Sequence, residues 1–345
     1  MFARPTALIL AFALIAAGRV TADDPKPAPK LKRLPADLVK AWDEQAWAGA
    51  GWMHVDDRAG PAWESGDTPA DDPRLKSRAF PALKVRKDKL DALAKLPAPD
   101  APFGLYAPLN NDQMKVVARF PSLRSLDLYE APLGDAGLKA LAATKLEHLG
   151  LTRTNVTDAG LKELAPLKDL RVLSLSGTDV TDAGLKHLAA LEKLEVLSLR
   201  HTDVTDAGMK ELLALKSLEW LVVSNTKVGD DGVKELAKMK SLTYLNVNNN
   251  SVTDAAMTDI AGMKQLRHLG LLNTKVTDAG IKELVALADL EELDLELTAV
   301  TKACVPDLAK MPKLKRLHLN LSKVSILDET AVRKALPNCK VTWGK

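Results

Sequence analysis

The chemically reactive side chains of this 345-residue chain are scattered, and none of them has the spacing of a catalytic motif. The sequence contains no H-E-x-x-H or G-x-S-x-G motif, no phosphate-binding glycine loop and no paired-cysteine zinc spacing. Nucleophilic and metal-assisted catalysis both need such groups at defined positions. The sequence therefore predicts no catalytic residue, no metal ligand and no cofactor, and it indicates a protein that is not an enzyme.

Three sets of polar residues could still bind an ion or a charged surface. His54 stands beside Asp56 and Asp57, although one histidine with two acids in a polar loop is more often simply solvated. A recurring aspartate could form a calcium ladder, but an aspartate at a helix start also complements the helix dipole. These aspartates are Asp158, Asp182, Asp206, Asp230, Asp254 and Asp278. A recurring lysine has glutamates beside it, which favours a neutralised, solvated face: Lys162, Lys186, Lys210 and Lys234.

A fourth set of polar and aromatic residues is the strongest candidate for ligand binding. It combines aromatic side chains, which are frequent anchors of protein partners, with polar and acidic ones. Its members are Trp220, Tyr244, His268, Arg200, Asn246, Asn248, Glu292, Asp294 and Glu296. Whether they share one surface depends on the elements that carry them.

Those elements belong to a repeat of 24 residues. Valines recur at this spacing at Val156, Val180, Val204, Val228, Val252, Val276 and Val300. Around each lies nearly the same text, L-x-x-L-x-L-x-x-T-x-V-T-D-A-G-L-K-x-L-x-x-L, and eight copies of its leucine triplet can be counted. Alternating leucines predict a short strand with one buried face, and the Thr-Asp pair predicts a helix start. Each unit is too short to bury its own apolar face, so neighbouring units must stack.

This text resembles the leucine-rich repeat family, whose motif is L-x-x-L-x-L-x-x-N/C-x-L. It looks closest to the ribonuclease-inhibitor-like and cysteine-containing kinds, and it is similar to sets of exported bacterial proteins. The resemblance covers about residues 97–345 and departs from the motif where threonine replaces the Asn or Cys. It implies an α/β fold, a curved solenoid with a concave parallel sheet and short convex helices. Strand–helix–strand connections predict a right-handed solenoid, and we expect the threonines to satisfy turn amides from repeat to repeat.

The ends of the chain differ from the repeats. Arg4, the apolar run 7–17 and the small residues 20–22 predict a cleavable signal peptide over residues 1–22. Residues 23–76 form a Pro-rich leader and a Trp-rich region, which we expect to cap the solenoid; a small binding module is the alternative. The solenoid is predicted over 77–345, with a C-terminal cap at 326–345. We therefore expect an exported protein, whether extracellular, periplasmic or attached to the cell surface.

The register of the repeat places the candidate ligand-binding residues on the concave face. Neighbouring strands lie about 4.8 Å apart, so Trp220, Tyr244 and His268 should form one exposed stripe. Arg200, Asn246 and Asn248 should lie on one side of the stripe. The acidic residues of the set should lie on the other: Glu292, Asp294 and Glu296. Because the Trp220 side chain should not be in the core, its replacement by alanine should weaken binding at least tenfold and leave thermal stability nearly unchanged.

Net charge narrows the classes of partner. The chain carries +3 with acids and bases interleaved, so nucleic acid and anionic membranes are not expected as partners. No later stretch is long and apolar enough to span a membrane. The leading hypothesis is a protein or peptide ligand on the concave sheet. A carbohydrate ligand, an enzyme with its chemistry in the N-terminal region, and an F-box-like adaptor are the alternatives. The sequence does not fix the oligomeric state.

The two cysteines, Cys304 and Cys339, are predicted not to form a disulfide. Cys304 takes the glycine place of a helix start, and Cys339 lies at the terminal strand two repeats further on. Two repeat steps span about 10 Å, which exceeds the roughly 7 Å Cα limit of a disulfide.

Overall fold

The computed structural model describes residues 34–46, 49–55, 61–64 and 80–343. The signal peptide expected over residues 1–22, the Pro-rich leader and Asp56 and Asp57 lie outside the described residues, as does the side chain of His54. Residues Leu31–Lys345 form one compact unit. No helix among the described residues is long and apolar enough to cross a membrane.

One sheet of 14 strands runs through this unit, in the order β14 to β3, then β1, then β2. The twelve strands β3 to β14 are parallel, as the repeat predicts. The strands are β1 (Gly49–Val55), β2 (Pro61–Glu64), β3 (Phe80–Lys84), β4 (Phe103–Tyr106), β5 (Leu123–Asp127), β6 (His148–Gly150), β7 (Val172–Ser174), β8 (Val196–Ser198), β9 (Trp220–Val222), β10 (Tyr244–Asn246), β11 (His268–Gly270), β12 (Glu292–Asp294), β13 (Arg316–His318) and β14 (Lys340–Thr342).

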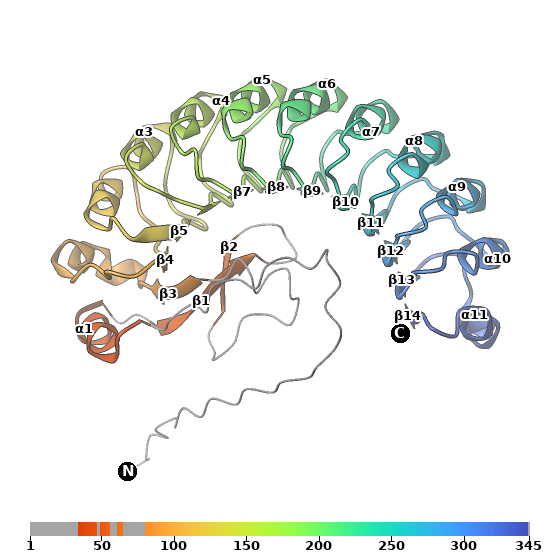
Figure 1. Cartoon of the computed structure of the whole chain (residues 1–345), viewed down its shortest axis with the longest axis horizontal. Helices are drawn as coiled ribbons and strands as arrows, with labels where there is room; N and C mark the ends of the chain where they lie inside the picture. Colours follow the sequence, from red (N-terminus) through yellow and green to blue (C-terminus); the bar gives the residue numbers. More distant parts are fainter. Residues whose placement is uncertain (1–33, 47–48, 56–60, 65–79, 344–345) are drawn as a thin grey trace, which may run out of the picture. The chain divides into compact units, whose positions relative to one another are not determined.

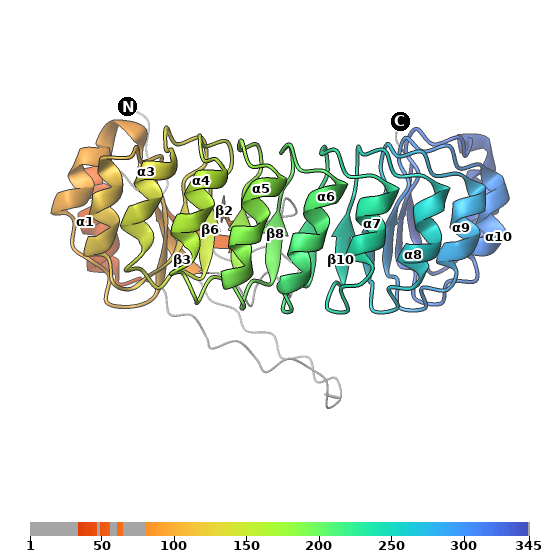
Figure 2. The same ribbon diagram turned by 90° about the horizontal axis from the view of Figure 1, so that it is seen from above.

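Short helices return the chain between successive strands and lie together outside the arc of strands (Figures 1 and 2). The α-helices are α1 (Ala36–Ala46), α3 (Asp135–Leu138), α4 (Asp158–Leu161), α5 (Asp182–Leu185), α6 (Asp206–Met209), α7 (Asp230–Leu236), α8 (Met257–Ala261), α9 (Asp278–Leu284), α10 (Val305–Leu308) and α11 (Glu329–Ala335). The 3-10 helices are η1 (Lys87–Lys95), η2 (Gln113–Arg119), η3 (Lys139–Leu141), η4 (Lys162–Leu164), η5 (Lys186–Ala190), η6 (Lys210–Ala214), η7 (Asp254–Ala256), η8 (Lys302–Cys304) and η9 (Ile326–Asp328).

A continuous apolar core lies between the sheet and the helices. The second strand leucine of each repeat, such as Leu173, and the helix leucines, such as Leu161 and Leu164, are fully buried. Full burial of one such side chain contributes about 1.5–3 kcal/mol relative to its exposed state. Because each repeat brings only a few of these residues, the core is complete only when neighbours stack.

A ladder of hydrogen bonds joins the helix starts of neighbouring repeats. The carboxylate of Asp182 accepts hydrogen bonds from the backbone N–H of Thr205 (2.8 Å) and from its hydroxyl (2.6 Å) in the next repeat. The Thr205 hydroxyl in turn accepts from the N–H of Ala207, as expected of an N-cap. Other aspartates with the same role are Asp135, Asp158, Asp230, Asp254 and Asp278. The sequence predicts that the aspartate complements the dipole of its own helix. It also links its repeat to the next one.

The threonine that replaces Asn or Cys in the motif has a local role, so the prediction that it links repeats is wrong. Thr178 donates its hydroxyl hydrogen bond to the carbonyl of Leu175 in its own turn, at 2.7 Å. The same bond within its own turn is made by each of Thr154, Thr202, Thr274 and Thr298. The longer Asn250 side chain does cross between repeats: it donates to the Val223 carbonyl and accepts from the Thr226 N–H.

The glycine of the helix start leaves room for the aspartate of the preceding repeat. A Cβ atom at Gly208 would lie 2.3 Å from a carboxylate oxygen of Asp182. Cys304 occupies the equivalent place near the C-terminus and is buried. Burial raises the pKa of its thiol to about 12, and the nearby Asp278 carboxylate adds to this effect. Both Cys304 and Cys339 are free thiols, which confirms that they are not bonded to each other.

The N-terminal segment continues the sheet beyond the repeats. The β1 strand pairs antiparallel with β3 and with β2, and α1 packs beside η1. The backbone of β2 then crosses the inner side of the arc and lies against β5, β6 and β7 (Figure 1). This segment therefore lies over part of the concave face as well as beside the first strand of the solenoid.

Candidate functional site

The concave face divides into a covered half and an accessible half. From β5 to β8 the inward-facing strand residues are almost fully buried, among them Ser125, His148, Val172 and Val196. The ring of Phe80 from β3 packs edge-on against His148, with ring centroids 5.0 Å apart. From β10 to β13 most of the equivalent positions are partly or fully exposed. Among the described residues, the inward-facing strand side chains are therefore more accessible in the C-terminal half of the sheet.

An aromatic stack lies at the boundary between these halves. Trp220, Tyr244 and His268 occupy paired positions on β9, β10 and β11, which confirms that they are adjacent. The rings of Trp220 and Tyr244 are stacked, with centroids 3.8 Å apart and an interplanar angle of 14°. The ring of His268 stacks on the other side of Tyr244, at 5.6 Å and 24°.

The prediction that this aromatic stripe is exposed is wrong for two of its three members. Trp220 is only 6% exposed and His268 only 5%, whereas Tyr244 is partly exposed. Trp220 packs in a second apolar cluster on the inner side of the sheet. The other members of that cluster are Val172, Val196, Val222 and the partly buried Tyr244. The premise for expecting an unchanged melting temperature on loss of Trp220 is therefore wrong, and we expect a destabilised variant instead.

Glu292 is the centre of a charged network beside the aromatic stack. Its carboxylate accepts hydrogen bonds from Arg316 at 2.6 and 2.9 Å, and it pairs with His318 at 3.2 Å. Burial alone would raise the pKa of Glu292, but the hydrogen bonds and charge of these two partners outweigh it and lower the pKa to about 2. The hydrogen bond to Glu292 raises the pKa of His318 in turn, against the effect of burial.

Asp294 and Glu296 form a second acidic pair. Unlike Glu292, neither makes a direct ion pair with a described residue, although the charge of both adds to the raised pKa of His318. Asp294 accepts hydrogen bonds from the backbone N–H of Glu296 (3.0 Å) and from the amide of Asn248 (3.4 Å). Burial raises the pKa of Asp294, and the charge of Glu296 raises it further. Glu296 accepts a hydrogen bond from the Asn320 amide. Three carboxylates, of Glu292, Asp294 and Glu296, therefore lie near two basic side chains, Arg316 and His318, and negative charge is in excess on this part of the face.

The remaining predicted residues surround the stack. Arg200, Asn246 and Asn248 are all partly exposed. Asn248 accepts a hydrogen bond from the backbone N–H of Leu272 at 2.8 Å, which holds its side chain between repeats. Arg200 forms no ion pair with any described residue, and its buried Nε atom has no hydrogen-bond partner. Arg200 lies on the side of the stack away from the acidic residues, as the register predicts.

Sequence reasoning passed over two members of the charged network and one set of hydroxyls. Arg316 and His318 occupy the same positions on their strand as Trp220 and Val222 do on theirs. The register of the repeat alone could therefore have placed them beside Glu292. Under the covered half, hydroxyl groups form a chain of hydrogen bonds of 2.8–3.2 Å. Its members are Thr152, Ser174, Ser176 and Ser198.

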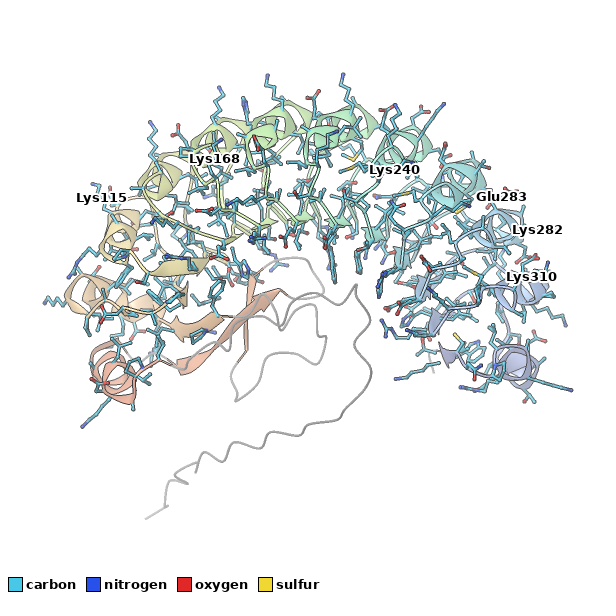
Figure 3. All side chains as sticks on the ribbon, in the orientation of Figure 1. Lys115, Lys168, Lys240, Lys282, Glu283 and Lys310 are labelled. Carbon is cyan, nitrogen blue, oxygen red and sulfur yellow. The ribbon has the colours of Figure 1, made fainter. Side chains whose placement is uncertain are left out.

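The convex face and the described residues as a whole show no competing ion site. No group of three or more His, Cys, Asp or Glu side chains among the described residues is placed to hold a metal ion. Lysines and glutamates lie next to one another on the outer helices, for example Lys282 and Glu283 (Figure 3). The aspartates considered for calcium instead accept hydrogen bonds from the next repeat, for example Asp158 from Thr181.

Residues 106–260 match the model of the family described as "Leucine-rich repeat region". This segment lies within the stack of parallel strands and short helices that the 24-residue repeat builds. This chain is a leucine-rich repeat protein. No curated protein sequence matches it.

Several solved structures are similar to this leucine-rich repeat protein. The internalin inlF of Listeria monocytogenes is 19% identical, with a TM-score of 0.48 over 74% of this chain and 84% of the other. The internalin C2 of the same organism is 20% identical, with a TM-score of 0.45 over 75% and 92% of the two chains. The ectodomain of the Arabidopsis receptor kinase HAESA, solved with an extended IDA peptide hormone, is 16% identical, with a TM-score of 0.46 over 61% and 36%.

Proposed function

We propose that this protein is exported through a cleavable signal peptide and binds a protein or peptide ligand on its concave face, from β9 to β13. The observation that carries this proposal is the division of the concave face. The half that remains accessible is also the half that presents a partly exposed aromatic ring and an excess of carboxylates. Tyr244, Asp294 and Glu296 are its central residues. Residues 1–22 have the pattern that supports export.

The arrangement of the rings supports a polypeptide over a carbohydrate ligand. A sugar packs against the exposed face of an aromatic ring. Both faces of Tyr244 are occupied, one by Trp220 and the other by His268. The partly exposed Tyr244 therefore presents no open ring face to a sugar. The partly exposed polar side chain of Asn246, on the same strand, suits hydrogen bonds to a peptide backbone.

Replacement of Tyr244 tests the proposal. The purified chain is incubated with the secreted proteins of its own source, the captured partner is isolated, and its Kd is measured for the wild type and for Tyr244→Ala. Loss of an interface anchor typically costs about 2 kcal/mol, so at least a tenfold weaker Kd is expected. Tyr129→Ala is the matched control, since Tyr129 follows β5 on the covered half. An unchanged Kd for a folded Tyr244→Ala variant would contradict the proposal.

A further inference from the structure

The exposed large apolar side chains of the described residues gather at one end of the solenoid. They are Leu297 (46% exposed), Leu321 (76%), Ile326 (57%) and Leu327 (91%). Leu297 follows the carboxyl end of β12, and Leu321 follows that of β13. Ile326 and Leu327 begin η9. All four therefore lie on the rim where strands lead into helices. A group of exposed apolar side chains on one surface is typical of an interaction site.

Leu297 and Leu321 also have a backbone conformation that disfavours leucine. They occupy the same position in neighbouring repeats, with φ angles of +54° and +55°. The left-handed region suits glycine and asparagine, and a branched side chain is strained there. The equivalent position in the other repeats holds a polar residue or glycine: Glu130, Arg153, Gly177, His201, Asn225, Asn249 and Asn273. The conformation of the two leucines is therefore locally unfavourable, and their exposed side chains gain little from burial on folding.

An excess of negative charge lies next to the first of these leucines. Glu296 immediately precedes Leu297, and the carboxylate of Asp294 lies close enough to Glu296 for its charge to affect it. Neither carboxylate forms an ion pair with a described residue, in contrast to Glu292, which binds Arg316. Exposed leucines near two such carboxylates are complementary to a ligand that carries an apolar side chain beside a cationic one.

We propose that this rim is the part of the site that recognises the ligand, which is a polypeptide with an apolar residue close to a lysine or arginine. The apolar side chain packs on Leu297 and Leu321, and the cationic group binds Asp294 and Glu296. This inference rests on the proposed function and assigns the chemistry of the ligand.

The variant Leu297→Asn/Leu321→Asn separates a binding role from a structural one. Asparagine suits the left-handed conformation and already occupies this position in three other repeats. We therefore expect a melting temperature that is unchanged or higher, together with at least tenfold weaker binding. His201→Asn, at the same position on the rim four repeats away, is the control and should leave both properties unchanged. A lower melting temperature with unchanged binding would overturn the proposal.

An immobilised array of synthetic peptides is the binding probe. Each peptide carries one leucine or phenylalanine and one lysine or arginine, separated by zero to four residues. In the control peptides, glutamate replaces the basic residue or serine replaces the apolar one. We expect the full chain to bind peptides with both features, to lose binding with either replacement, and to lose it as salt is raised.

The outcomes distinguish the two proposals. Peptide binding that is lost in Tyr244→Ala but retained in Leu297→Asn/Leu321→Asn would overturn the rim assignment and leave the concave site in place. Absence of any selective peptide binding would count against both. Self-association of the wild-type chain in sedimentation that is lost in the double leucine variant would assign the rim to a second copy of the chain. Binding of the wild-type chain to lipid vesicles that is lost in the same variant would assign the rim to a membrane. Either result would overturn the peptide assignment.

Discussion

Trp220 contributes to the folded state through its contacts with Tyr244 on one side and the valines of β7 and β8 on the other. Large-to-small changes at buried aromatic residues typically cost about 3–5 kcal/mol. We expect Trp220→Ala to lower the free energy of unfolding by about that amount, as measured by denaturant titration. A loss below about 1 kcal/mol would show that the cluster around Trp220 does not stabilise the sheet.

The charged network predicts a dependence of stability on pH. Glu292, whose pKa is lowered to about 2, stabilises the fold above its ordinary pKa and loses this contribution as pH falls toward 2. His318, whose pKa is raised, stabilises the fold below its ordinary pKa and loses this contribution as pH rises through the raised value. The joint contribution is therefore largest between about pH 4.5 and 6.5.

His318→Gln isolates the histidine part of this dependence. The decrease in unfolding free energy between about pH 6 and pH 8.5 should be smaller in the variant than in the wild type, since the variant has no proton to lose at this position. The matched control is His187→Gln, because His187 lies on an outer helix away from Glu292. Identical pH profiles for the wild type and His318→Gln would contradict the assigned ion pair.

Which residues share a strand column could be predicted from the sequence, but their exposure could not. The 24-residue register places Trp220, Tyr244 and His268 side by side, and the structure agrees. The burial of Trp220 depends on stacking and packing between large side chains. The burial of the N-terminal half involves β2, which reaches β5 to β7 from about 60 residues or more away in the chain. The repeat pattern carries no information about such a long-range contact.

At the scale of single elements, the aspartate at each helix start is the main polar link between repeats. Asp182→Ala would leave the N–H and hydroxyl of Thr205 without their partner, and unpaired polar groups of this kind cost about 1–3 kcal/mol. We expect a loss of this size in thermal or chemical unfolding. Asp203→Ala is the control, since Asp203 forms only an exposed ion pair with Lys227.

Gly208 and Asp182 should be coupled in the same experiment. A Cβ at position 208 would lie 2.3 Å from the Asp182 carboxylate, so Gly208→Ala should destabilise the wild type. In the Asp182→Ala background that clash is absent, and the cost of Gly208→Ala should fall by about 0.5–3 kcal/mol. Additive effects of the two substitutions would mean that the carboxylate moves aside freely.

The sequence predicts the positions of these elements well because every repeat offers the same pattern of leucines and the same Thr-Asp start. It predicts the direction of their polar contacts poorly. In a periodic sequence, a contact within a repeat and a contact to the next repeat involve the same residue types. Asp158 and Thr178 illustrate both cases: the aspartate bonds to the next repeat and the threonine to its own turn.

At the scale of the whole unit, the N-terminal segment and the solenoid together determine which part of the concave face is exposed. The solenoid offers one long concave sheet, and the backbone of β2 lies against β5, β6 and β7. The C-terminal half then carries Tyr244, the acidic pair Asp294 and Glu296, and the exposed leucines of the rim. These features together favour a binding protein whose ligand occupies the C-terminal half of the arc.

Carboxyl footprinting of the chain, free and with its captured partner, tests this account most directly. A water-soluble carbodiimide labels accessible carboxylates, and mass spectrometry locates the labels. We predict that the partner protects Asp294 and Glu296 and leaves the labelling of Glu211 and Glu283 on the outer helices unchanged. Protection of the outer glutamates, with Asp294 and Glu296 labelled as in the free chain, would contradict the concave site.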